Sequence, residues 1–192
     1  MKIIPLYNNE KQLLEKARKG NRLAQQAIYR QHAPKMLSVC RMYIHDLQFA
    51  EDVLLRGFLK VFENLDQFRF KGSFEGWIRR IMTNEAIDFL RTHKPLDFSE
   101  DIENQPELSV DNLETNNELD FIQGLIDELP EGYKIVFILF CVEGYKHREI
   151  AEILEITVGT SKSQLAKARK ELQKKLNQKA WEDEFRGIRK KD

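Results

Sequence analysis

One stretch of this chain, from Asp97 to Asp120, contains no lysine or arginine, and it separates two blocks that both carry helical apolar spacing. Acidic residues recur through the stretch, together with Pro106 and several Asn and Ser residues. Charge of one sign combined with proline and small polar residues is typical of a flexible linker. A chain of 192 residues with such an acidic linker is expected to fold as two small domains.

Apolar residues of the first block recur at three- and four-residue steps, which indicates helices. Asn21 is a candidate N-cap, and a helix or two follow it through Ile44. Further helices are expected over 49–62 and 74–90. The segment between them, Phe68 to Ser73, is too basic, aromatic and glycine-bearing for an ordinary helix and is expected to be a loop.

The second block is expected to begin with two helices that Pro130 separates, and Gly144 should end the second of them. The pattern nowhere favours strands, so the predicted fold class is all-α. We expect a helical bundle over 1–94, the flexible acidic linker over 95–118, a helix-turn-helix domain over 119–180 and a tail over 181–192. For the tail, extension of the last helix and disorder both stay open.

Bulk composition sets further limits. Lysine plus arginine balance aspartate plus glutamate at 31 each, but the charges are segregated, so nucleic-acid binding is not excluded. Cys40 and Cys141 match no metal-ligand spacing and are expected to be reduced and buried. The start carries no signal-peptide core, and no stretch has the roughly 20 apolar residues of a membrane helix. These features predict a cytoplasmic protein.

The strongest local pattern is a short helix over 147–154, a tight turn over 155–157 and a longer helix that Thr157 caps. This arrangement predicts a helix-turn-helix. At about 100° per residue, one stripe of the second helix should face the core: Ser161, Leu165, Ala168, Leu172 and Leu176. The opposite face is basic and small, as a major-groove reader requires: Ser163, Ala166, Lys167, Lys170 and Lys174. The alternative is a solvated amphipathic helix.

Aromatic and basic residues alternate in FRFKGSFEGWIRRIMTNEAIDFLRTHK, which begins at Phe68. Aromatic faces stack on unpaired bases and cations follow the backbone, so the segment suits melted DNA. The alternative is that Trp77 and the phenylalanines are core. The preceding helix is apolar over a wider arc than a small domain can bury, which favours a partner surface. Gly57 within it suggests that something packs closely there.

Two segments resemble a known family. AEDVLLRGFLKVFENLDQFRFKGSFEGWIRRIMTNEAIDFLR resembles region 2 of sigma-70 factors of the extracytoplasmic-function (ECF) group, and LDELPEGYKIVFILFCVEGYKHREIAEILEITVGTSKSQLAKARKEL resembles their region 4. The order of the segments and the linker between them also fit. The resemblance implies a non-enzymatic factor that binds core RNA polymerase, recognises the minus-35 and minus-10 promoter elements and promotes DNA melting.

The same resemblance implies residue roles. The residues expected to bind polymerase are Asp52, Val53, Phe58, Val61 and Phe62. The loop from Phe68 to Phe74 is expected to capture a flipped base of the minus-10 element. The residues expected to contact that element are Phe68, Arg69, Lys71, Phe74, Trp77, Arg80, Asn84, Asp88 and Arg91. The residues expected to contact the minus-35 element are Lys162, Ser163, Lys167 and Lys170.

Partners implied by the resemblance are promoter DNA, the clamp helices and flap of core polymerase, and an anti-sigma protein; no cofactor or metal is implied. One departure stands out. Where the family usually has a Gln-Glu pair after the two apolar residues that follow Asp52, this chain has Leu55 and Arg56, a change that weakens or re-aims docking.

Two other function classes were weighed. A stand-alone helix-turn-helix regulator explains the second block but leaves the first without a task. An enzyme, such as a nuclease or metal-dependent hydrolase, is disfavoured because the histidines form no ligand spacing and no glycine-rich phosphate loop is present.

Overall fold

The computed structural model describes residues 10–93, Phe98 and residues 118–189, and every regular element in these ranges is helical. The all-α prediction is confirmed. The chain divides into two compact units, Met1–Pro95 and Leu96–Asp192. Apart from Phe98 and Glu118, the linker expected over 95–118 lies outside the described residues, so its flexibility stays a prediction.

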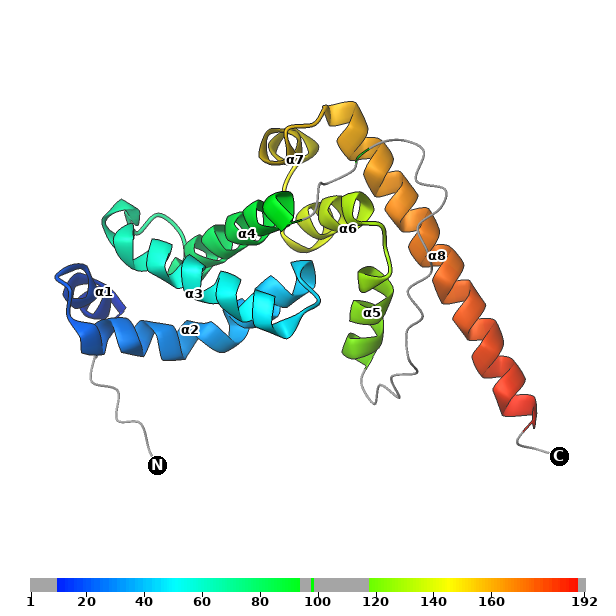
Figure 1. Cartoon of the computed structure of the whole chain (residues 1–192), viewed down its shortest axis with the longest axis horizontal. Helices are drawn as coiled ribbons and strands as arrows, with labels where there is room; N and C mark the ends of the chain where they lie inside the picture. Colours follow the sequence, from blue (N-terminus) through cyan, green and yellow to red (C-terminus); the bar gives the residue numbers. More distant parts are fainter. Residues whose placement is uncertain (1–9, 94–97, 99–117, 190–192) are drawn as a thin grey trace. The chain divides into compact units, whose positions relative to one another are not determined.

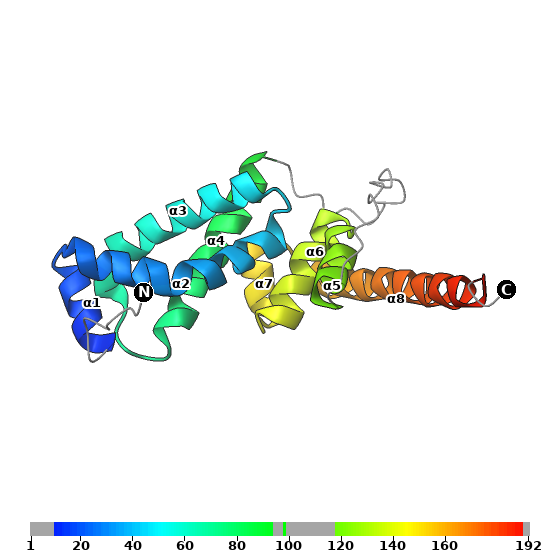
Figure 2. The same cartoon turned by 90° about the horizontal axis from the view of Figure 1, so that it is seen from below.

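The first unit consists of the helices α1 (Glu10–Arg18), α2 (Arg22–Tyr43), α3 (Leu47–Glu63) and α4 (Phe74–His93), with the short 3-10 helix η1 (Leu65–Gln67) before α4. α2, α3 and α4 pack on one another, and α1 packs against α2 and η1 (Figures 1 and 2). The segment after Asn21 forms one helix as far as Tyr43, with Pro34 inside it.

Short polar side chains start two of these helices, as the sequence allows. The Asn21 carboxamide oxygen accepts a hydrogen bond from the Ala24 amide at 3.0 Å, which confirms Asn21 as the cap of α2. Asp46 does the same for α3 through the Phe49 amide at 3.1 Å. Each bond satisfies one of the amides that a helix start leaves unpaired.

Gly57 lies where α3 and α4 approach most closely. A Cβ atom at this position would lie 2.3 Å from the Met82 sulfur, and Met82 is fully buried. The close packing that the mid-helix glycine suggested is therefore against Met82. Glu85 on the same face of α4 is buried and forms an ion pair with Lys60 of α3.

The second unit consists of α5 (Glu118–Asp127), α6 (Glu131–Phe137), the π-helical turn η2 (Ile138–Val142), α7 (His147–Leu154) and α8 (Val158–Arg189). α6 and α7 both pack against α8. The C-terminal half of α8 extends past α5, α6 and α7 (Figure 1), so the helix continues into the segment expected to be a tail.

Two sequence expectations for the second unit need correction. Cys141 is exposed rather than buried, and Val142 beside it is also exposed, because the π-helical turn directs Phe140 rather than its neighbours towards α7. Leu176 was expected in the core stripe of α8 but is 46% exposed. At that point α8 has passed the part of the domain that could cover it.

Cys40 follows the expectation. It is fully buried in α2, and burial raises the pKa of its thiol to about 12. A thiol with such a pKa stays protonated near neutral pH and behaves as a small apolar side chain. None of the described helices is long and apolar enough to cross a membrane. Within residues 10–93 and 122–178, no group of three or more His, Cys, Asp or Glu side chains could hold a metal ion.

His32 gives the first unit a testable pH dependence. It is buried in α2, edge-on to the Phe74 ring at 5.6 Å between centroids. Burial lowers the pKa of His32 below its ordinary value of 6.5; the carboxylates of Glu75 and Glu10 partly oppose this, and Lys35 adds to it. The unfolded chain therefore binds a proton near pH 6.5 that the folded chain resists, and stability falls as the pH drops through 6.5.

We expect urea unfolding, followed by Trp77 fluorescence in a Trp181→Phe background, to show lower stability at pH 5.5 than at pH 7.5. His32→Gln should reduce that difference. An unchanged difference in the variant would show that His32 is not its source.

Candidate nucleic-acid and polymerase interfaces

The helix-turn-helix geometry arises from two turns of backbone. α7 ends at Leu154, and Glu155 adopts a left-handed conformation (φ 56°) that lets the Ile156 amide reach the Ala151 carbonyl at 3.0 Å. The Thr157 hydroxyl then accepts a hydrogen bond from the Thr160 amide at 2.9 Å and caps α8. The predicted helix over 147–154 and the predicted cap are both confirmed.

A side-chain cluster fixes the start of α7 onto α8. The His147 Nδ1 and Ser161 Oγ atoms are hydrogen bonded at 2.9 Å, and the His147 ring stacks on Phe140 with 4.5 Å between centroids. The Arg169 guanidinium lies 5.8 Å from the Phe140 ring centre. Burial, Lys162 and Arg169 all lower the pKa of His147, so the ring is mainly neutral near pH 7.

The outer face of α8 matches the basic face expected from the sequence. Lys162 and Lys170 are exposed, and Ser163 and Lys167 are half-buried. The Lys167 ammonium lies 6.0 Å from the Tyr133 ring centre, which places its alkyl chain along the surface of α6. Ser161, Leu165 and Ala168 on the opposite face are buried, as the core stripe requires.

Sequence reasoning missed Gln164, which is 1% exposed within the same helix. Its amide nitrogen donates to the Phe98 carbonyl at 3.1 Å, and its carbonyl oxygen has no hydrogen-bond partner among the described residues. Phe98 therefore belongs to the second unit, although the domain boundary at residue 119 had assigned it to the linker. No apolar period could reveal a buried glutamine paired with a residue so far away in sequence.

α4 presents a polar and aromatic stripe opposite its buried face. The stripe consists of Trp77, Arg80, Asn84, Asp88 and Arg91, at steps of three or four residues. Arg80, Asn84 and Asp88 are exposed, whereas Trp77 and Arg91 are half-buried. Five of the residues expected to contact the minus-10 element thus share one accessible face of a single helix.

The loop before α4 divides into a buried and an exposed part. Phe68 and Phe74 are 4% and 2% exposed, and their ring centroids lie 5.1 Å apart. Because both rings are buried, the prediction that they stack on bases does not fit the structure. They pack against the half-buried Trp77 instead, with 5.6 and 5.7 Å between the ring centroids. Arg69 and Lys71 are exposed, as a DNA contact requires.

Phe70 is the exposed aromatic residue of this loop; it lies within the segment expected to capture a flipped base but was not among the individually named contacts. Its φ is 56°, a left-handed conformation that costs a bulky residue about 1–3 kcal/mol. Gly72 also has a positive φ, and the Ser73 hydroxyl then accepts a hydrogen bond from the Gly76 amide to start α4. The sequence shows the glycine and the serine but gives no sign of the strained phenylalanine.

α3 corrects the predicted polymerase contacts. Val53, Phe58 and Val61 are at most 2% exposed, because they form the stripe that packs on α2 and α4, so they cannot contact a partner directly. The accessible side of α3 includes Asp52, Leu55, Leu59 and the half-buried Phe62, and the exposed Glu51, Arg56 and Glu63 share it. Leu55 and Leu59 are 52% and 62% exposed, and this confirms that the first unit cannot bury the whole apolar arc.

The two departures from the family pattern on α3 differ in position. Arg56 lies with its guanidinium 5.4 Å from the Phe89 ring centre, so it is engaged within its own domain. Leu55 is on the accessible face. Both residues are exposed, so both departures alter the outer surface of α3.

Comparison with known proteins assigns both units. Residues 28–95 match the family model described as sigma-70 region 2, and residues 122–172 match that of sigma-70 region 4. The ECF RNA polymerase sigma factor SigW of Bacillus subtilis is 31% identical over 183 residues, covering 86% of this chain and 96% of its own length. The chain belongs to the sigma-70 family, as an ECF sigma factor.

Two further matches agree with this assignment. The RNA polymerase sigma-H factor of Pseudomonas aeruginosa is 28% identical over 185 residues, which cover 87% of the sigma factor described here and 93% of the relative. The structure of the sigma factor RpoE of Bartonella quintana, solved with the anti-sigma factor NepR, has a TM-score of 0.52 at 19% identity and covers 79% of this chain and 96% of that one. The likeness to the Bartonella quintana structure concerns the fold alone.

Membership of this family establishes the class of activity. The sigma factor acts in transcription initiation, and the family is not enzymatic. The regulator and enzyme alternatives are therefore set aside, and α2 to α4 lie in region 2 while α5 to α8 contain region 4.

Proposed function

We propose that this sigma factor docks on core RNA polymerase through α3, reads the minus-35 element with α8 and captures the melted minus-10 element with α4 and its preceding loop. The observation that carries the proposal is that three accessible helix faces, each of a different chemistry, occur in one chain of the sigma family. The face of α3 carries exposed leucines among charged residues, that of α4 is aromatic and polar, and that of α8 is basic.

Support for the upstream role comes from the second unit. Lys162, Ser163, Lys167 and Lys170 occupy the first turns of the second helix of a helix-turn-helix, the part that enters a major groove in such motifs. The lysines can neutralise phosphates, and Ser163 is small enough for close approach. The cap at Thr157 and the His147–Ser161 hydrogen bond hold this helix against α7, so the face is presented rigidly.

The downstream role is supported by α4 and its loop. Trp77 offers a half-buried aromatic surface backed by Phe68 and Phe74, and Arg69 and Lys71 are exposed cations of the loop before α4. Extruding a base from a duplex costs a few kcal/mol, which stacking on a fixed aromatic ring can offset. Arg80, Asn84, Asp88 and Arg91 extend the contact along the helix.

For docking, the accessible face of α3 provides two exposed leucines beside Asp52 and Phe62. A pair of apolar side chains on a small monomeric domain is typical of a protein-binding surface. We assign this face to the clamp helices of the largest polymerase subunit and the second unit to the flap. Leu55 makes the docking face more apolar, which re-aims docking towards apolar contact.

Regulation by an anti-sigma protein is a part of the same proposal. A structural relative was solved with an anti-sigma factor, and such a partner of this chain would have to cover at least one of the three faces to block initiation.

The docking face gives the first test. Leu59→Asp should weaken binding to core polymerase at least tenfold, because it replaces a buried leucine contact with a desolvated charge. Fluorescence anisotropy of the labelled sigma factor measures this. Leu23→Asp on α2 is a matched control, since Leu23 is equally exposed at 64%. Weak binding by the control alone would move the docking face to α2.

The upstream face gives the second. Lys167→Ala should weaken binding of the polymerase complex to the minus-35 element about tenfold and lower its salt dependence by about one released ion. Titrations at several salt concentrations measure both. Lys19→Ala, which removes an exposed lysine of the first unit outside the proposed DNA contacts, is the control. Equal loss of core docking and DNA binding in Lys167→Ala would sink the assignment.

Trp77 provides the third. Trp77→Ala should permit recruitment to promoter DNA yet impair opening, because the surface on which a base stacks is lost. Permanganate reactivity of promoter thymines reports the opening, and gel retardation reports recruitment. Normal reactivity in the variant would count against a stacking role for Trp77.

A further inference from the structure

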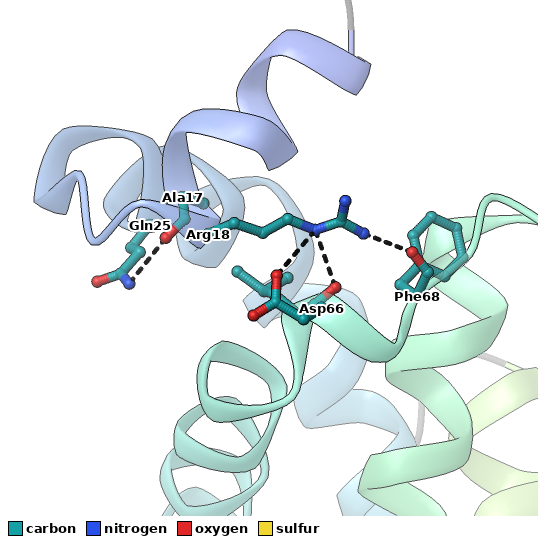
Figure 3. A network of polar contacts seen from close by, with 6 residues as sticks. Ala17, Arg18, Gln25, Asp66 and Phe68 are labelled. Atoms are coloured by element: carbon teal, nitrogen blue, oxygen red, sulfur yellow. Dashed lines mark hydrogen bonds and ion pairs between the residues drawn. The ribbon is translucent and has the colours of Figure 1, made fainter.

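Side chains of α1 contact the loop between η1 and α4, although the sequence analysis gave α1 no role. Arg18, the last residue of α1, donates from Nε to the Leu65 carbonyl at 3.0 Å and from Nη2 to the Phe68 carbonyl (Figure 3). The Leu65 carbonyl, at the start of η1, also accepts a hydrogen bond from the Phe68 amide at 3.2 Å, and the Phe68 carbonyl lies just past the end of η1. The planar guanidinium satisfies both from one side chain.

The same guanidinium also lies against Phe70, the exposed aromatic residue of the loop. Arg18 Cζ lies 5.2 Å from the Phe70 ring centre, and the Lys11 ammonium, also from α1, lies 5.9 Å from it. Both distances are within the range of cation–π attraction. The ring of Phe70 is 42% exposed and its backbone is left-handed, so contacts from outside the loop must hold this conformation.

Asp66 contributes little to this arrangement. Its carboxylate is 3.8 Å from Arg18 Nε and its side chain is 86% exposed, so water screens the ion pair. Arg18 itself is only 22% exposed, and its hydrogen bonds to backbone carbonyls are better shielded. The fork of hydrogen bonds, rather than the ion pair, is the contact that sets the loop.

Packing around α1 fixes Arg18 in turn. Leu14 and Ala17 of α1 are buried within the first unit. Gly20 has a φ of 77°, so the chain turns back and the Gly20 amide donates to the Ala17 carbonyl at 3.0 Å. The Gln25 side chain of α2 donates to the same carbonyl at 3.3 Å (Figure 3). The end of α1 is thus held from both sides.

We propose that Arg18 is a positioning residue for promoter opening: it fixes the loop so that the Phe70 ring is presented to an unpaired base of the minus-10 element. The inference rests on the proposed role of that loop and adds α1 and Phe70 to it. Arg18 acts through the two backbone carbonyls and the ring, and does not itself contact DNA.

The test compares Arg18→Ala with wild type in complete polymerase complexes. Permanganate reactivity on a duplex promoter should fall about tenfold, whereas binding to core polymerase should change less than about twofold because α3 is untouched. On a template with a mismatched, already open minus-10 element, the defect should shrink, since the cost of extruding the base is already met. Arg30→Ala, an exposed arginine on α2, should behave as wild type.

Two further variants separate positioning from folding. Arg18→Lys keeps the charge but cannot donate to both carbonyls in the same plane, so it should open duplex promoters as poorly as Arg18→Ala. Phe70→Gly removes the ring while suiting the left-handed backbone, so its unfolding midpoint should not fall, yet it should share the opening defect. Full activity of either variant would overturn the proposal.

Trp77→Ala distinguishes this inference from the proposed function. Impaired opening in Trp77→Ala with normal opening in Arg18→Ala would overturn the role of Arg18 alone. Normal opening in both would overturn the assignment of the loop itself. Equal losses of core docking and opening in Arg18→Ala, together with a lowered unfolding midpoint, would show that Arg18 serves only folding.

Discussion

In a small helical domain most helices bury only one stripe, and this constraint shapes α3, α4 and α8 of the sigma factor. In α3 the buried stripe contains Val53, Phe58 and Val61, and the opposite stripe leaves Leu55 and Leu59 in contact with solvent. α4 and α8 follow the same rule with different chemistry on the outer side. The core therefore decides which residues remain for partners, and the spacing that builds the bundle also arranges the surfaces that bind.

Backbone conformation adds what helix periodicity cannot. The left-handed residues Phe70 and Glu155 each occur immediately before a helix with a proposed DNA-binding face, and a hydroxyl cap from Ser73 or Thr157 follows. A turn of this kind fixes the angle at which the next helix leaves the domain. The direction of α4 and α8 is thus set by a few hydrogen bonds, and Arg18 adds to these from a third helix in the first unit.

Much of this arrangement could be predicted from the sequence. The bounds of α7, the caps at Asn21 and Thr157 and the basic outer face of α8 all follow from local patterns, since they depend on residues three or four positions apart. Burial was predicted less well. Phe58 and Phe74 carry the family's binding pattern but lie in the core, because apolar periodicity alone does not say which side of a helix its neighbours cover.

Contacts between distant residues could not be predicted at all. The hydrogen bond from Gln164 to Phe98 and that from Arg18 to Leu65 join positions 66 and 47 residues apart. Nothing in the local sequence marks a glutamine as buried or an arginine as the support of a loop. The same holds for Cys141, whose exposure follows from a π-helical turn that shifts the face of one apolar run.

In the proposed function, two separate domains, each with its own DNA-binding face, direct one polymerase to a promoter. Run-off transcription by purified core polymerase, with and without this protein, on a library of promoters from its own genome is the decisive test. We predict transcripts that depend on the protein, begin at defined sites and share two upstream sequence elements. Absence of such transcripts, together with absence of binding to core polymerase, would contradict it.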